Sequence, residues 1–193
     1  MTVLLDRVLA RVAAHRPRTH QPRGSGFHAA TALVLTREPD PRLVVIRRAS
    51  RTGDPWSGHA ALPGGRRDDT DPDLAHTARR ETAEEVGLLV GDPVGRLDDI
   101  GGRTHPGVVS PFVFAVREAA PLVPEPGEVA AAHWVPLRVL TDPAHRTRHP
   151  SRHVGPWPAW SWPTGMEPPM DDLVIWGLTH RTLTNFLEVA DLA

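Results

Sequence analysis

The stretch Gly58–Leu88, GHAALPGGRRDDTDPDLAHTARRETAEEVGL, decides how this chain is interpreted. Its centre is the charged run Arg79–Glu85, which a Pro-Gly-Gly turn precedes and Val-Gly-Leu follows. In a helix, residues three and four apart lie on one face, so Glu81, Glu84 and Glu85 are predicted to project three carboxylates toward one side. Like charges so close repel one another, which is poor for stability alone. A divalent cation such as Mg²⁺ or Mn²⁺ would reverse the sign of that interaction, whereas the alternative is a solvated charged helix.

The charged run resembles the Nudix box, G-x5-E-x7-R-E-U-x-E-E-x-G-U, in which U is an aliphatic residue. The matching residues are Arg80, Glu81, Glu84, Glu85, Gly87 and Leu88. Two positions depart from the pattern. Thr82 takes an aliphatic position, and fourteen residues separate Gly65 from Arg80 where the pattern has thirteen. The single-Glu position therefore falls among Asp71, Pro72 and Asp73, where no Glu is available.

The one-residue expansion is similar to the variant box of the coenzyme A pyrophosphatase branch of this superfamily. Residues 47–65, RRASRTGDPWSGHAALPGG, are also similar to the additional motif of that branch. Leu62 replaces the usual Phe before Pro-Gly-Gly. The resemblance therefore extends upstream of the box itself.

The resemblance implies an α/β fold, with a mixed β-sheet sandwiched between helices, and metal-dependent hydrolysis of a pyrophosphate linked to another moiety. Glu81, Glu84 and Glu85 would hold Mg²⁺ or Mn²⁺, and Arg80 would orient the carboxylates by charge-assisted hydrogen bonds. The general base would be one of these glutamates or a loop glutamate. Glu128 is the better match for the loop residue by its distance to Trp134, and Glu125 is the second choice.

Coenzyme A or an acyl-CoA is the first substrate that the resemblance implies. ADP-ribose, NADH, dinucleoside polyphosphates and an oxidised nucleotide stay open. A catalytically silent Nudix module that binds a nucleotide is an alternative from a different class. The intact Arg-Glu and Glu-Glu pairs argue against a silent site.

Several residues before the box are candidates for substrate binding. Arg47, Arg48 and Arg51 follow a predicted strand and suit phosphate contacts, with a solvated basic edge as the alternative. Trp56 is a candidate to stack on a base, to line a pantetheine channel or to cap the core. The other candidates are Gly64 and Gly65, since glycine permits close backbone approach to a ligand.

Composition is consistent with a cytoplasmic enzyme that binds a small molecule. The 193 residues carry 22 basic and 23 acidic side chains, so the net charge of -1 favours neither nucleic acid nor acidic membranes. There is no Cys, which excludes thiolate sites. No stretch approaches the length of a membrane span. We expect one domain over residues 1–193, with an N-terminal helix and linker over 1–27 and an insertion over 145–170.

Periodicity predicts the main elements. Residues 3–14 form an amphipathic helix with Val3, Leu4, Val8 and Val12 on one face, for packing or for a homodimer. A second helix is expected after an N-cap at Asp71 or Asp73 and ends at Gly87. A third runs from Asp171 to about Ala190. The predicted strands are 29–36, 43–47, 94–100, 108–116 and 132–135, with an edge or bulge at Pro111.

The insertion over 145–170 is dense in Pro, His and Trp. We predict that it is neither regular helix nor interior sheet. Trp157, Trp160 and Trp162 are too apolar for a purely disordered linker. A loop that covers the substrate pocket and a loop that packs against the domain would use them equally well. We expect this segment to set substrate specificity.

Overall fold

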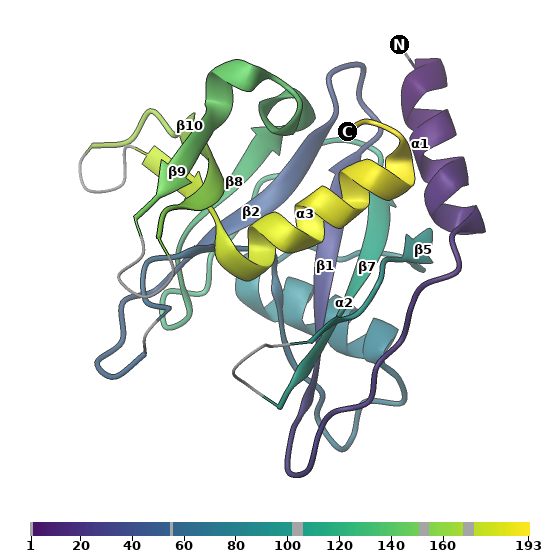
Figure 1. Cartoon of the computed structure of the whole chain (residues 1–193), viewed down its shortest axis with the longest axis vertical. Coiled ribbons are helices and arrows are strands. Elements are labelled where there is room, and N and C mark those ends of the chain that lie inside the picture. Colours follow the sequence, from purple (N-terminus) through teal and green to yellow (C-terminus); the bar gives the residue numbers. More distant parts are fainter. Residues whose placement is uncertain (1, 55, 102–105, 151–154, 168–171) are drawn as a thin grey trace.

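The computed structural model describes residues 2–54, 56–101, 106–150, 155–167 and 172–193 (Figure 1). The regular structure of these residues consists of two sheets, three α-helices and two short 3-10 helices, Leu137–Leu140 and Pro143–His145. The helices are α1 (Thr2–Ala14), α2 (Leu74–Val86) and α3 (Gly177–Ala190). No helix in the described part of the chain has both the length and the apolar character that a membrane span needs.

The main sheet has eight strands. They are β1 (His28–Thr36), β2 (Arg42–Arg48), β3 (Ala60–Ala61), β4 (Gly64–Arg66), β5 (Gly95–Arg96), β6 (Ile100–Gly101), β7 (Val108–Val116) and β8 (Val129–Pro136). β1 pairs in parallel with β7, whereas the other pairs in this sheet are antiparallel. The sheet is therefore mixed, as expected. β1 and β2 separate after Leu35 and Leu43, and the short strands β4 and β3 pair with the divergent ends.

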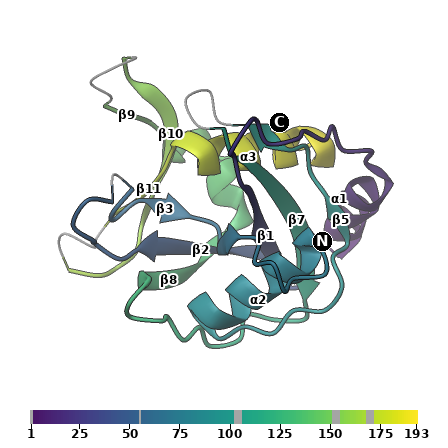
Figure 2. The ribbon, with the colours of Figure 1, turned by 90° about the horizontal axis from the view of Figure 1, so that it is seen from below.

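Helices cover both faces of this sheet, because the strands alternate apolar side chains between two cores (Figures 1 and 2). Val44 and Ile46 of β2 pack toward α2. Leu43 and Val45, which point to the opposite face, pack with residues of α1 and α3. The expected α/β/α arrangement is confirmed. The position of a polar residue along β2 therefore determines whether its side chain lies on the α2 face or on the face covered by α1 and α3.

The ends of α2 follow the predicted cap residues. The Asp73 carboxylate accepts a hydrogen bond from the His76 N–H at 2.7 Å, so Asp73 rather than Asp71 is the N-cap. Gly87 ends the helix with φ of 67°, a left-handed conformation that glycine adopts readily. These caps set which residues of α2 face the sheet.

The predicted strand 94–100 is wrong in its extent. Only Gly95–Arg96 and Ile100–Gly101 pair with β7. Between them, Asp98 and Asp99 turn toward the linker after α1, where they accept hydrogen bonds from the backbone N–H groups of Arg18 and His20. Pro111 lies inside β7 rather than at an edge of the sheet, opposite the gap between β5 and β6.

The insertion forms regular structure, contrary to the prediction. β9 (Arg146–His149), β10 (Trp157–Pro163) and β11 (Asp172–Ile175) form a three-stranded antiparallel sheet with β10 in the middle. The abundance of proline concealed the alternation of Trp160 and Trp162, which share one face with Leu173 and Ile175. Pro163 is tolerated because it is the last residue of its strand.

The third helix starts later than predicted. Asp171, the expected N-cap, lies outside the described residues. β11 occupies the start of the predicted helix, and α3 begins at Gly177 after Trp176. The segment before Gly177 is extended because it adds a strand to β10.

Two of the three insertion tryptophans pack against the body of the domain. Trp160 is buried and stacks on His180 of α3, with 4.1 Å between ring centroids. Trp162 packs edge-on against His133 of β8 at 5.7 Å. Trp157 is half-buried at the start of β10.

The N-terminal helix also packs within the chain. Leu5, Val8, Leu9 and Val12 are buried in the core that contains residues of α3. The packing alternative is therefore confirmed for this helix. The side chains of Val3 and Leu4 lie outside the described residues, and the predicted homodimer stays a prediction.

Replacement of Trp160 by Ala should lower the free energy of unfolding by about 3 kcal/mol, because it leaves a cavity beside His180. Trp157→Ala should lower it by less than half as much. Urea unfolding followed by circular dichroism measures both values. Equal, small effects would show that the insertion sheet is not part of the core.

Candidate metal and catalytic site

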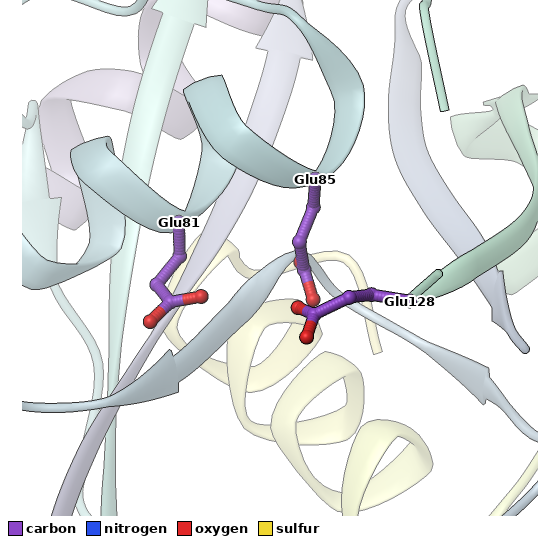
Figure 3. Close-up of side chains that lie close together, drawn as sticks. All are labelled: Glu81, Glu85 and Glu128. Atoms are coloured by element: carbon purple, nitrogen blue, oxygen red, sulfur yellow. The ribbon is translucent and has the colours of Figure 1, made fainter. Parts of the chain in front are cut away.

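Three glutamates from two separate segments converge beside the main sheet (Figure 3). Glu81 and Glu85 lie one turn apart on α2, and Glu128 precedes β8. One carboxylate oxygen from each lies within 4.8 Å of the other two. Ionisation of all three carboxylates at this spacing is unfavourable, and a divalent cation between them would favour it.

Backbone hydrogen bonds hold the segment that carries Glu128 against the end of α2. The N–H groups of Val123 and Glu125 each donate to the carbonyl of a residue at the end of this helix, Val86 and Glu85 respectively, at 2.9 Å. The Ala49 N–H donates to the Glu128 carbonyl at 2.8 Å. The structure therefore selects Glu128 over Glu125, because Glu125 is absent from the carboxylate group that it describes.

Glu85 is the most buried member of the group, with 4% of its surface exposed. Burial, together with the nearby Glu81 and Glu128 charges, raises the pKa of Glu85 to about 8. The Gly64 N–H donates to its carboxylate at 2.9 Å, and that bond lowers the pKa. Glu85 is therefore enclosed where it meets the β4 turn, although it belongs to a charged stretch of α2.

Glu81 lies directly against the glycine turn. A Cβ atom on Gly65 would stand 2.5 Å from the Glu81 Cδ and Oε1 atoms. A Cβ on Gly64 would instead stand 2.3 Å from the Ala30 carbonyl oxygen, and Gly64 has a φ of 152°. Both glycines therefore serve the carboxylates and the sheet in this structure: Gly65 leaves room for Glu81, and Gly64 brings an N–H to Glu85.

Arg80 makes the contacts that the sequence predicts. Its guanidinium lies 2.9 Å from the Glu81 carboxylate and 2.8 Å from that of Glu84. Burial raises the pKa of Glu81, and the Arg80 charge opposes that change. Arg80 thus fixes the position of Glu81 from the side away from Glu85.

Asp71 is a site residue whose role the sequence did not reveal. Its buried carboxylate accepts two hydrogen bonds from Arg80, at 3.1 Å each, and one from the Thr77 hydroxyl at 2.8 Å. The hydrogen bonds from Arg80 hold the pKa of Asp71 far below its ordinary value. Asp71 stands nine positions before Arg80 and occupies the place where the box has its single Glu. This position in the box is the sequence feature from which a role for Asp71 could have been predicted.

Glu84 is not part of the carboxylate group that the structure describes around Glu81 and Glu85, and its role as a metal ligand stays a prediction. Glu84 is exposed and its carboxylate is paired with Arg80. Arg80 contacts the carboxylates of both Glu81 and Glu84, so Glu84 stays near Glu81 but is held by the arginine. Glu128 takes the third place in the described carboxylate group.

The three candidate arginines separate onto different surfaces. Arg47 follows Val45 in the alternation of β2, so its side chain lies on the face opposite α2 and donates to the Asp172 carbonyl. The Arg47 side chain therefore lies on the face of the sheet opposite the one that α2 and its glutamates cover. Arg48 lies on the α2 face and pairs with Asp54 at 2.8 Å. Arg51 lies 3.0 Å from the Glu128 carboxylate.

Trp56 has 48% of its surface exposed, so it does not cap the core. Its backbone N–H donates to Asp54, the partner of Arg48. Trp56 and Arg48 therefore share a contact with Asp54. The roles of Trp56 toward a base or a pantetheine group stay predictions.

The donor set fits a hard divalent cation. All three converging groups are carboxylates, the ligand type that Mg²⁺ and Mn²⁺ prefer, and Glu85 is buried at an energetic cost that a cation would offset. Glu81, Glu85 and Glu128 would hold such an ion. The fit rests on residues from α2 and from the loop before β8, and not on the helix alone.

The family model of the NUDIX domain matches residues 26–166. The chain belongs to the NUDIX family. Nudix hydrolase NudL of Cronobacter sakazakii is 34% identical over 135 residues, which cover 69% of each protein. An uncharacterized protein of Schizosaccharomyces pombe is 39% identical over 117 residues, 56% of this chain and 36% of that protein. This chain therefore spans about a third of the length of the yeast relative.

A solved structure agrees at the level of the fold. A MutT/nudix family protein from Enterococcus faecalis matches with a TM-score of 0.58 at 18% identity, over 97% of this chain and 70% of that one. At this identity the match shows the Nudix fold alone. The family match and the Nudix hydrolase relative support the expected class of enzyme, a Nudix-type pyrophosphohydrolase.

Gly65→Ala should fold but bind Mn²⁺ about tenfold more weakly or worse, because the new Cβ displaces the flexible end of Glu81. Gly91→Ala is the matched control, since a Cβ there meets nothing within 4 Å. Calorimetric titration with Mn²⁺ compares the two variants. Unchanged affinity in Gly65→Ala would show that the Glu81 carboxylate is not a ligand.

Asp71→Asn should lower the free energy of unfolding by about 3 kcal/mol at pH 7, because it removes the buried charge that pairs with the partly buried Arg80. The folded-state pKa of Asp71 is depressed, so its stabilisation is present above pH 4 and is lost as pH falls further. The difference between wild type and variant should therefore shrink in acid. A constant difference from pH 7 to pH 3, measured by urea unfolding, would contradict this account.

Proposed function

We propose that this chain hydrolyses the pyrophosphate bond of a nucleoside diphosphate linked to another moiety, with Mg²⁺ or Mn²⁺. The observation that carries the proposal is the meeting of Glu81, Glu85 and Glu128, one of them buried, beside a glycine turn that excludes side chains. A group of this kind is expensive to fold unless a cation occupies it. Family membership gives the class of reaction.

The chain contributes ligands, phosphate contacts and a base. A bound divalent cation would neutralise the diphosphate and lower the pKa of a water molecule. Glu128 is the exposed carboxylate of the group, so it is the residue placed to accept a proton from water. Glu85 is too enclosed for that role and would serve as a ligand. Glu84, exposed within one turn of Glu81, would join as a further ligand after leaving Arg80.

Arg48 and Arg51 are the arginines left to hold substrate phosphates. Both carry guanidinium groups near the glutamates: Arg51 contacts Glu128, and the Arg48 charge lowers the pKa of Glu85. Their present partners, Asp54 and Glu128, are carboxylates that phosphate oxygens would replace or share. Arg80, braced by Asp71, would keep Glu81 in position.

Coenzyme A or an acyl-CoA is the first substrate in this proposal. Its support is the expanded box and the upstream motif over residues 47–65. ADP-ribose, NADH, dinucleoside polyphosphates and an oxidised nucleotide are the other substrates to test. A cytoplasmic location and a possible homodimer are parts of the proposal that come from the sequence alone.

Glu85→Gln should lower turnover at least about 100-fold, since it removes a ligand oxygen while the remaining amide oxygen still accepts from Gly64. The substrates are coenzyme A, acetyl-CoA, ADP-ribose, NADH and diadenosine polyphosphates, each with Mn²⁺. Phosphate-ester products are measured by chromatography. Glu188→Gln, the same change at an exposed position of α3, is the control.

The same variant should keep or raise the stability of the metal-free protein at pH 9. Because the folded-state pKa of Glu85 is raised, its contribution to stability falls as pH rises from about 4.5 to about 8, and Gln removes that loss. Thermal unfolding with a chelator measures this effect. Activity on no substrate of the panel would favour a silent binding module, and full activity in Glu85→Gln would exclude the ligand role.

A further inference from the structure

Three aromatic side chains gather near Arg48, whose charge acts on one of them, His59. His149 of β9 stacks on Trp176, with 3.9 Å between ring centroids and 17° between planes. His59, just before β3, packs edge-on against Trp176 at 4.8 Å. The three residues come from three separate segments of the chain, and His59 and Trp176 are 117 positions apart. All three are partly exposed, so this aromatic cluster is not sealed in the core.

The strand register places the aromatic cluster close to the glutamate group. Arg48 pairs with Val129, next to Glu128, and its N–H donates to the His59 carbonyl at 3.0 Å. His59 and Val129 therefore flank Arg48 on its two sides. Neighbouring strands are about 4.8 Å apart, so the backbones of His59 and Val129 lie about 10 Å from each other. Figure 2 shows the succession β8, β2, β3 and β11.

The side chain of Arg48 also has an unsatisfied hydrogen-bond donor. Its Nε–H is buried and has no hydrogen-bond acceptor in the part of the chain that the structure describes. One terminal nitrogen is held by Asp54. Arg48 therefore has an unused donor, and its charge acts both on Glu85 and on His59.

The rings suit a neutral planar ligand. Burial lowers the pKa of both His59 and His149, which keeps the imidazoles uncharged at neutral pH. Neutral aromatic faces stack on nucleobases, and such stacking tolerates different bases. If these residues only packed the strands together, aliphatic side chains would serve equally well. His59, His149 and Trp176 are instead aromatic and partly exposed to water.

We propose that His149, Trp176 and His59 form the binding site for the aromatic base of the substrate, while Arg48 holds a phosphate between that base and the glutamates. This inference rests on the proposed function and deepens it. The substrate class is a nucleoside diphosphate with a planar base, such as the adenine that coenzyme A, NADH and ADP-ribose share. The base end, and not the other moiety, lies on the insertion sheet.

Binding of AMP and of ribose 5-phosphate to the metal-free protein tests the inference. AMP carries the base and ribose 5-phosphate lacks it, and ligand-observed NMR titration with a chelator measures both affinities. We expect wild type to bind AMP about tenfold or more tightly than ribose 5-phosphate. Trp176→Leu should remove that difference, whereas Trp176→Phe should keep it. His149→Leu and His149→Phe repeat the comparison on the second ring.

Hydrolysis is not needed for this readout, so its failure is separate from that of the proposed function. Equal binding of the two ligands by wild type, or equal AMP affinity in folded Leu and Phe variants, would overturn the base site. If hydrolysis is found, the KM for coenzyme A should rise about tenfold in Trp176→Leu, while a base-free diphosphate, 5-phosphoribosyl pyrophosphate, keeps its KM. An unchanged KM for coenzyme A in that variant would also overturn the base site.

Discussion

The burial of the Glu85 carboxylate among other carboxylates is the constraint on which the site depends. A buried carboxylate is costly when ionised, and two acidic neighbours add to that cost. A single backbone hydrogen bond from Gly64 offsets part of it. The fold maintains this arrangement through packing elsewhere, because Val86 beside Glu85 and Ala78 two turns earlier are fully buried against the sheet.

The surroundings of Glu85 are arranged to keep its partners in reach. The β4 turn has no side chain where Glu81 lies, and the loop before β8 is hydrogen-bonded to the last turn of α2. Asp71 braces Arg80, which in turn holds Glu81. The expansion of the box by one residue thus coincides with a shorter acid, Asp in place of Glu, at the position that supports the arginine.

Local patterns predicted much of the fold and part of the site. The caps at Asp73 and Gly87 and the strands β1 and β7 follow from short-range chemistry, so sequence reasoning found them. The pairing of Glu81 with Glu85 follows from helical spacing. Glu128 was identified only by resemblance, because no local pattern relates a loop to a helix more than forty residues away.

The errors share one cause, which is that they depend on register between distant segments. The extent of the predicted strand 94–100 depends on how β5 and β6 pair with β7. The insertion sheet needs β11 beside β10, a pairing that proline content obscured. No role for Trp176 could be predicted from the residues next to it in the sequence. Its contacts with His149 and His59 form only in the folded chain.

Diffraction from a crystal soaked in Mn²⁺, recorded near the manganese absorption edge, tests the central claim most directly. The account predicts an anomalous peak among the carboxylate oxygens of Glu81, Glu85 and Glu128, within bonding distance of at least two of them. A crystal with no peak there, in which Arg51 or Arg80 fills the space between the three carboxylates, would contradict it.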